Sequence, residues 1–249
     1  MTARVRGVLK HSVGNDEKRL VVRSVAPDGD CFYKCVALAY ESTNLDDEDE
    51  ELFSVSMLRQ IVAAELTEEQ LSSFRIASEA GMREYDHVLK IFPQQTTRSR
   101  RKRARIDPEA KLDSATELWA TLEEVKHRLI LSGKDVGPAS CVWADEWSMR
   151  VLCSQLSLHI LLIDEQAKTS TNRFILLSPT TPVTVDQKSS DNKTSPANCI
   201  LLQRTRREHM NLILVDSQGI TPLNELPEHW KQKWGLPISP VPSTTDATS

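Results

Sequence analysis

Two short motifs, far apart in the chain, contain residue types that can cleave an acyl bond. The first, Asp28 to Cys31 (Asp-Gly-Asp-Cys), places a thiol where an extended run ends and a helical pattern begins. The second, Glu208 to Asn211 (Glu-His-Met-Asn), supplies an imidazole. A thiol attacks only as the thiolate, and a helix N-terminus with a nearby histidine can lower its pKa from about 8.5. The pair predicts cysteine chemistry, with Cys31 as nucleophile and His209 as base.

The segments around both motifs predict the elements that present them. Residues 19–25 have the pattern of a short strand, and residues 31–40 have apolar side chains at helical spacing. Residues 209–215 are rich in strand-forming types, and the period of two places His209 and Asn211 on one face, where the amide can orient the imidazole. A lone cysteine or histidine in such an element is more often structural than catalytic, so neither motif is sufficient alone.

Three separated motifs together resemble one protein family. Residues 27–32 (Pro-Asp-Gly-Asp-Cys-Phe) resemble the nucleophile motif of the ovarian tumour (OTU) cysteine proteases, which are deubiquitinases of the papain-like superfamily. Residues 143–150 are similar to the central Trp-Gly/Ala-Asp segment of that family, and residues 208–211 to its terminal His-x-Asn/Asp motif. The resemblance covers roughly residues 20–216.

The resemblance implies catalytic roles at the matching positions. Cys31 would be the nucleophile, and His209 the general base that later protonates the leaving amine. Two residues are candidates for the third catalytic member. Asn211 matches the position that orients the histidine and ranks first, while Asp28 matches a second acidic position that some members use.

The resemblance also implies an oxyanion hole and a substrate cleft. Backbone N–H groups of Cys31 and of the preceding turn, which includes Gly29 and Asp30, would bind the oxyanion, and glycine permits the sharp approach. Asp30 is also the expected N-cap of the helix. Trp143 and Glu208 are candidates for residues that border the cleft, although core packing is the default for a tryptophan.

The fold implied by the resemblance is an α/β (α+β) papain-like OTU fold. It has a small, mostly antiparallel sheet flanked by helices, with the cleft between the Cys31 helix and the His209 strand. About 100 residues separate the first helix from Trp143, which implies an enlarged helical arm. Met210 and Ala144 depart from the family pattern, since an aromatic residue and a glycine are usual there, but neither touches the chemistry.

The implied function is that of a deubiquitinase. It would hydrolyse isopeptide or peptide bonds after the C-terminal glycine of ubiquitin or a ubiquitin-like modifier through a thioester, and no cofactor is needed. Two alternatives stay open: a catalytically inactive ubiquitin-binding module with the same fold, and a viral or pathogen protease that processes a polyprotein. A nucleic-acid-binding protein ranks below both, because the net charge is −4 and the basic run at 98–105 lacks aromatic residues.

Composition divides the chain into three parts. Residues 1–18 are an N-terminal extension, 19–220 the OTU-like protease domain, and 221–249 a C-terminal tail expected to be largely disordered. An insertion at about 94–112 contains the basic run Arg98 to Arg105. That run is consistent with a solvated loop, with a nuclear localisation signal that binds an import receptor, or with a basic patch for an acidic partner.

Cysteine usage and hydropathy indicate the compartment. The five cysteines are odd in number and form no Cys-x-x-Cys pair, which disfavours a zinc site or a secreted disulfide framework. No apolar run approaches 18 residues, so a membrane partner is not expected. We expect an intracellular protein of the cytoplasm, with the nucleus open through the basic run, while a secreted effector exported by another route would look the same.

Capping signals and periodicity predict the remaining elements. The helices are expected at 52–66, at 67–79 behind a capping box of Thr67 and Gln70, and from Ser114 to Leu129 with Gly133 as C-cap. The strands are expected at 158–163, 173–177 and 198–203. The last of these should form an antiparallel hairpin with 209–215, and that hairpin would bring His209 to the cleft.

Overall fold

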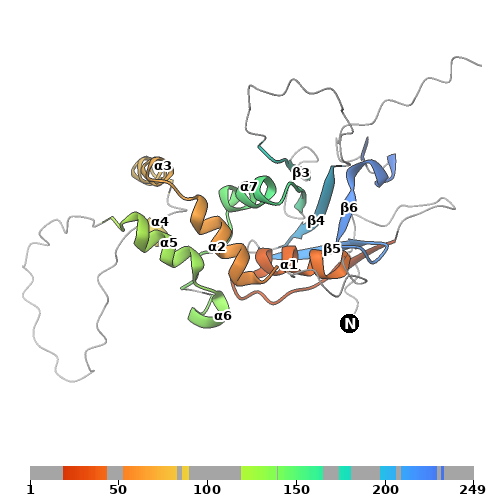
Figure 1. The fold of residues 1–249 in the computed structure, drawn as a ribbon, viewed down its shortest axis with the longest axis horizontal. Coiled ribbons are helices and arrows are strands. Elements are labelled where there is room, and N and C mark those ends of the chain that lie inside the picture. The colour runs from red at the N-terminus through yellow and green to blue at the C-terminus, as the bar shows by residue number, and fades with distance from the viewer. Residues whose placement is uncertain are drawn as a thin grey trace, which may run out of the picture.

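The structure is a computed structural model of the 249-residue chain. It describes residues 19–43, 53–82, 86–89, 119–138, 140–164, 174–180, 197–205, 209–228 and 231–232. These residues form helices and one mixed sheet, which confirms the predicted α+β class. Figure 1 shows the sheet at one end of the molecule and α3, α4 and α5 at the other, with α2 between them.

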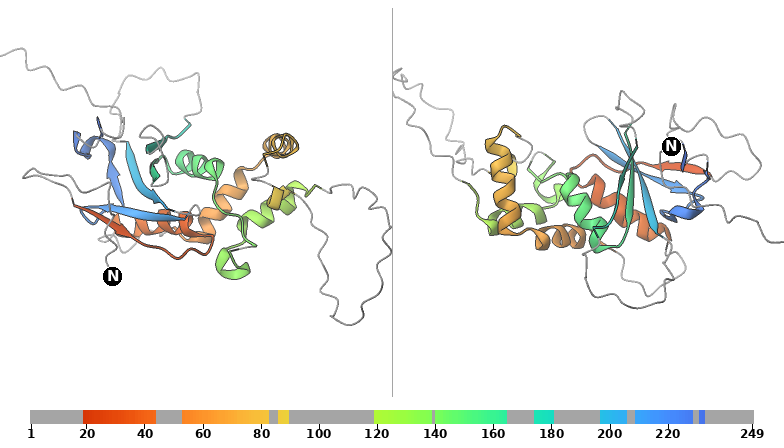
Figure 2. Two further views of the ribbon diagram at one scale, coloured as in Figure 1. Left: turned by 180° about the vertical axis from the view of Figure 1, so that it is seen from behind. Right: turned by 90° about the horizontal axis from the view of Figure 1, so that it is seen from above.

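The elements follow one another in this order: β1 (Leu20–Arg23), α1 (Cys31–Thr43), α2 (Val55–Glu65), α3 (Glu68–Glu79), α4 (Asp86–Leu89), α5 (Leu122–Ile130), α6 (Gly133–Val136), α7 (Glu146–Gln155), β2 (His159–Asp164), β3 (Phe174–Leu177), β4 (Asn198–Arg204), β5 (Met210–Val215), β6 (Ile220–Pro222) and a 3-10 turn (Leu223–Glu225). We call the helices α2 to α6 the helical arm. In both views of Figure 2, α3 and α5 lie away from the sheet.

The sheet has the strand order β1-β5-β4-β2-β3, and β6 pairs with β4. Among the strands of the described residues, only β2 and β4 pair in parallel, so the prediction of a mostly antiparallel sheet is confirmed. The predicted hairpin of β4 and β5 is also confirmed, with Gln203 opposite Asn211. At the loop end of the hairpin, Thr205 donates its backbone N–H (2.8 Å) and its hydroxyl (3.2 Å) to the carbonyl oxygen of His209, which fixes the histidine backbone.

The main core lies between the sheet and the helices α1 and α7. The predicted apolar stripe of α1 is buried there with side chains from one face of the sheet: Phe32, Cys35, Val36, Ala39, Ile160, Leu162, Ile200, Leu202 and Leu212. Burial of each large apolar side chain contributes about 1.5 to 3 kcal/mol, so this packing holds α1 firmly across β5. A second cluster, which includes Leu66, Leu71, Val125 and Leu129, forms the core of the helical arm.

Two predicted helix boundaries in the arm are wrong. The helix expected from Ser114 to Leu129 does not include residues 119–121: α5 begins at Leu122, because Thr121 is extended and forms a reciprocal capping box with Glu124. Ser114 itself lies outside the described residues. Gly133 is not a C-cap, since Leu131 caps α5 and Gly133 opens α6 behind the N-cap Ser132. The capping box of Thr67 and Gln70 at the start of α3 is confirmed.

The packed chain also continues past residue 220, where the tail was predicted to begin. Strand β6 pairs with the first half of β4, and Leu226 is buried in a cluster on the second face of the sheet. Residues 1–18, the insertion at 94–112 with its basic run, and the residues after Pro237 lie outside the described part. In the described ranges, no helix is both long and apolar enough to cross a membrane.

Candidate active site

Cys31 is the first residue of α1 and is buried, with 3% of its surface exposed. Burial raises the pKa of its thiol, and backbone N–H groups of Met210 and Phe32 that face the sulfur offset this only in part. The pKa of this thiol is therefore raised, and not lowered as its place at a helix N-terminus led us to expect, because burial disfavours the thiolate. A base must remove the proton during reaction.

The turn before Cys31 requires glycine at position 29. Gly29 has φ of +89°, and a Cβ there would lie 2.1 Å from the sulfur of Cys141. The indole nitrogen of Trp143 would be 3.4 Å from the same Cβ, and it donates a 2.8 Å hydrogen bond to the carbonyl oxygen of Pro138. Trp143 therefore borders the nucleophile turn and also packs against the main core.

The carboxylate of Asp28 serves the turn and not the histidine. Its Oδ1 accepts the backbone N–H of Asp30 at 3.2 Å, and its Oδ2 forms an ion pair with Lys34 on the first turn of α1. Because the N–H of Asp30 is bonded to Asp28, it is not free to bind an oxyanion.

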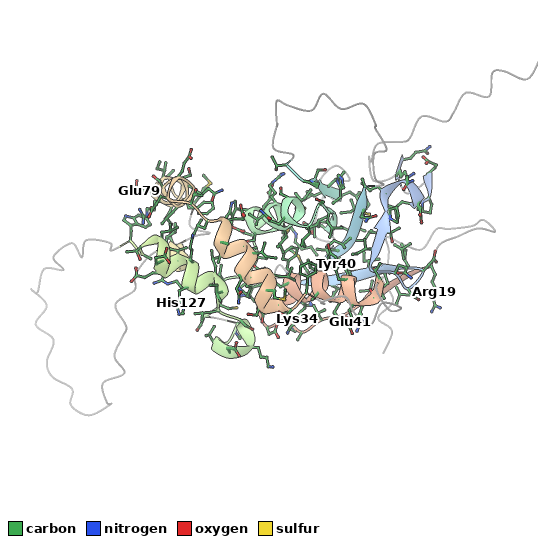
Figure 3. All side chains as sticks on the ribbon, in the orientation of Figure 1. Arg19, Lys34, Tyr40, Glu41, Glu79 and His127 are labelled. Atoms are coloured by element: carbon green, nitrogen blue, oxygen red, sulfur yellow. The ribbon has the colours of Figure 1, made fainter. Side chains whose placement is uncertain are left out.

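In Figure 3, Lys34 and Tyr40 mark the course of α1, whereas Glu79 and His127 mark α3 and α5 at the far end of the arm.

Asp30 holds the N-cap position, but its side chain does not cap the helix. Its backbone oxygen accepts the N–H of Lys34 at 2.9 Å, whereas its carboxylate is buried against Arg59 (2.8 Å from Nε) and Ser132 (2.7 Å from Oγ). Burial opposes ionisation, but hydrogen bonds from Ser132, the backbone of Gly133 and Arg59 outweigh it and lower the pKa of Asp30. The carboxylate is thus an anchor for the turn.

His209 and Asn211 form a directed pair at the start of β5. Nε2 of His209 lies 3.1 Å from Oδ1 of Asn211, and that oxygen also accepts the backbone N–H of Val25 at 3.4 Å. The amide nitrogen of Asn211 donates to Gln203 at 3.4 Å. The backbone N–H of Val25 donates to this side-chain atom of Asn211, which identifies the atom as the amide oxygen and not the amide nitrogen. Because an amide oxygen only accepts hydrogen bonds, Nε2 of His209 must carry the hydrogen.

The other ring nitrogen of His209 is therefore the basic one. In the neutral imidazole only one nitrogen carries hydrogen, which leaves the lone pair on Nδ1. Nδ1 is buried and has no hydrogen-bond partner among the described residues. A buried acceptor without a partner is costly, by about 1 to 3 kcal/mol, and such exceptions occur at functional sites.

Packing of α1 on β5 brings the thiol to this strand. The sulfur of Cys35 donates to the carbonyl oxygen of Met210 at 3.7 Å, and the N–H of Met210 faces the sulfur of Cys31. Cys31 therefore lies against the backbone of the residue that follows His209. The structure pairs His209 with Asn211 and sets Cys31 against Met210, the residue between them, while Asp28 and Gly29 form the turn before Cys31.

Other predicted features lie outside the described residues or have no counterpart in them. Glu208 and the run at 98–105 are outside. No group of three or more potential metal ligands is found in the described ranges. All five cysteines are free and buried, and His159 bonds to Ser178 (3.0 Å).

Sequence reasoning missed Arg59, although its position carried a signal. In α2 it occupies a core position of the helical pattern, between the buried Leu58 and Val62. A charged residue at such a position needs a buried partner. Val25 and Gln203, which hold Asn211, carried no such signal.

Comparisons with known proteins give matches only among solved structures. No family model matches the chain, and no curated protein matches it. A crystal structure of an OTU deubiquitinase from Wolbachia pipientis wMel is 10% identical, with a TM-score of 0.42 over 80% of this chain and 90% of that chain. The same enzyme bound to ubiquitin is 10% identical, with a TM-score of 0.38 over 80% and 98%.

A further similar structure, an OTU domain in complex with ubiquitin, is 12% identical, with a TM-score of 0.41 over 84% of this chain and 78% of that chain. These structures are OTU domains, the family that the three sequence motifs resemble. At these TM-scores the likeness assigns no role to any residue, and the chemistry of the site rests on the geometry of this chain.

Proposed function

We propose that the protein is a cysteine-dependent hydrolase that cleaves the bond after the C-terminal glycine of ubiquitin or a ubiquitin-like modifier. One observation carries the chemistry: Asn211 holds His209 so that its lone pair is on the buried Nδ1. The packing of α1 on β5, which sets the thiol of Cys31 against Met210, the next residue in the chain, supports a reaction between Cys31 and His209. A thiol, an oriented base and an amide that orients the base are the components of Cys-His-Asn catalysis.

The reaction starts with transfer of the proton of Cys31 to Nδ1 of His209. The thiolate then attacks the carbonyl carbon, and the backbone N–H of Cys31 stabilises the oxyanion. The carbon–nitrogen bond breaks, and the amine leaves with the proton from His209, which gives a thioester. A water molecule, deprotonated by His209, hydrolyses the thioester to the carboxylate and restores the thiol.

The substrate class is supported by the three motifs that resemble OTU deubiquitinases. This substrate class implies that the extended C-terminal end of the substrate, with its small residues, lies along the turn at Gly29 and beside the indole of Trp143, which borders that turn. Asn211, and not Asp28, is the proposed third catalytic member, because its oxygen is the one bonded to His209.

The test is covalent labelling with ubiquitin that carries a C-terminal electrophile, measured by intact mass. The wild type should form one adduct, and both Cys31→Ala and His209→Ala should abolish or strongly slow it. Cys199→Ala, which removes a thiol buried on the other face of the sheet, is the matched control and should label normally. Binding of ubiquitin without an adduct would refute the hydrolase and favour the inactive module. Cleavage of peptides alone would favour the polyprotein protease.

A further inference from the structure

Arg59 is a fully buried cation directly behind the nucleophile turn. Its side chain has 0% of its surface exposed, and its ion pair with Asp30 has an Nη2–Oδ1 distance of 2.6 Å. The guanidinium also lies 4.4 Å from the ring centroid of Tyr33, which is on the first turn of α1. Burial of a charge is costly unless its hydrogen bonds are made.

The hydrogen bonds of Arg59 reach three parts of the chain. Nε and Nη2 bind Asp30 and the carbonyl oxygen of Gly29, at 2.8 Å and 3.1 Å. Nη1 binds the carbonyl oxygens of Leu129 on α5 (3.0 Å) and of Val142 before α7 (3.1 Å). One side chain of α2 therefore ties the helical arm to the turn that carries the nucleophile.

These bonds fix the peptide between Gly29 and Asp30, one residue before Cys31, from both edges. The carbonyl oxygen of Gly29 is held by Arg59 on one edge, and the N–H of Asp30 is held by Asp28 on the other. The backbone oxygen of Asp30 is bonded into the helix by Lys34. The position of this fixed peptide sets the direction of the N–H and the side chain of Cys31, so the direction of the thiol depends on Arg59.

We propose that Arg59, acting through Asp30 and Gly29, is a positioning residue that holds the thiol of Cys31 against His209 and links this alignment to the helical arm. The inference rests on the proposed function, since it assumes that Cys31 and His209 react as a pair. Arg59 touches no substrate and takes no part in proton transfer.

The test is a double-mutant cycle on alkylation of Cys31 by iodoacetamide at pH 7, followed by peptide mass. The variants are His209→Ala, Arg59→Lys and the two combined, with the folded fraction measured by circular dichroism. Lysine keeps the charge but cannot form the forked set of bonds. In the wild-type background His209→Ala should slow alkylation at least about tenfold, and in the Arg59→Lys background it should change the rate less than about twofold.

A second measurement separates alignment from binding. With the ubiquitin electrophile, Arg59→Lys should lower the inactivation rate constant about 10- to 100-fold and leave the apparent binding constant unchanged. Arg150→Lys is the matched control, because Arg150 is exposed and pairs only with Glu146 among the described residues, and both constants should stay at the wild-type values. If Arg59→Lys does not fold, Ser132→Ala, which deletes one 2.7 Å bond to Asp30, replaces it in the cycle with a smaller effect in the same direction.

The outcomes distinguish this inference from the proposed function. If His209→Ala does not slow alkylation in the wild-type background, the Cys-His pair fails, and the inference about Arg59 fails with it. If His209→Ala slows alkylation equally in both backgrounds, the pair stands and only the role of Arg59 is overturned. Loss of thermal stability with unchanged rates per folded molecule would likewise overturn it.

Discussion

The substitution Gly29→Ala should damage both catalysis and stability, and the structure gives the size of each effect. Alanine at φ of +89° costs about 1 to 2 kcal/mol by backbone strain. Its Cβ would also lie 2.1 Å from the sulfur of Cys141, so the turn or the sulfur must move by about 1.3 Å to reach a tolerable 3.4 Å. A displacement of about 1 Å at a reacting group can cost about 100-fold in rate.

Two comparison variants separate the two effects. Gly81→Ala meets the same kind of strain, with φ of +97° and no atom within 4 Å of the new Cβ, so it should lower stability and leave the rate unchanged. In the Gly29→Ala background, Cys141→Ala removes the clashing sulfur and should restore much of the rate while the backbone strain remains.

The assay is steady-state hydrolysis of a fluorogenic ubiquitin C-terminal amide, with urea unfolding of each variant. Gly29→Ala should lower kcat/KM about 100-fold and the free energy of unfolding by about 1 to 3 kcal/mol. Wild-type kcat/KM in a folded Gly29→Ala protein would refute the reasoning, and so would a failure of Cys141→Ala to restore any activity.

Three further predictions concern the base, the thiol and the anchoring carboxylate. Asn211→Ala should lower kcat about 100-fold and Asp28→Ala less than about tenfold, because only the first residue bonds to His209; equal losses in kcat would contradict this. In His209→Ala, the rate of alkylation of Cys31 should keep rising with pH above the pH at which the rate for free cysteine reaches its plateau, because burial raises the pKa of this thiol. A plateau at or below the pH found for free cysteine would contradict this prediction. The pKa of Asp30 is lowered by folding from 3.8, so its stabilisation is present above that value and is lost as pH falls through the lower folded-state pKa. Urea unfolding between pH 2 and 6 should show that loss in the wild type and a flatter profile in Asp30→Asn.

Local signals in the sequence predicted local structure well. The apolar stripe of α1 is buried, and the capping box of Thr67 and Gln70 opens α3, because both depend on residues within one or two turns. The period of two likewise placed His209 and Asn211 together. The box of Thr121 and Glu124, which the prediction overlooked, is a local signal of the same kind and sets the start of α5.

Features that depend on distant partners could not be predicted in this way. The side chain of Asp30 could have capped α1, but its buried partners come from α2 and from Ser132. Burial of Cys31 likewise depends on the packing of α1 and β5, so the direction of its pKa shift was not available from the motif. A helix dipole can be inferred from sequence, whereas desolvation requires the complete fold.

The pairing of β1 with β5 has a consequence for the order of folding. Strand β1 lies just before the nucleophile, yet its only strand partner in the described part of the chain is β5, which is far downstream. On the ribosome the segment with Cys31 emerges long before the segment with His209 and Asn211, so the emerging polypeptide holds the thiol without its base. The proposed activity can therefore arise only after this long-range pairing, and the high contact order should slow folding.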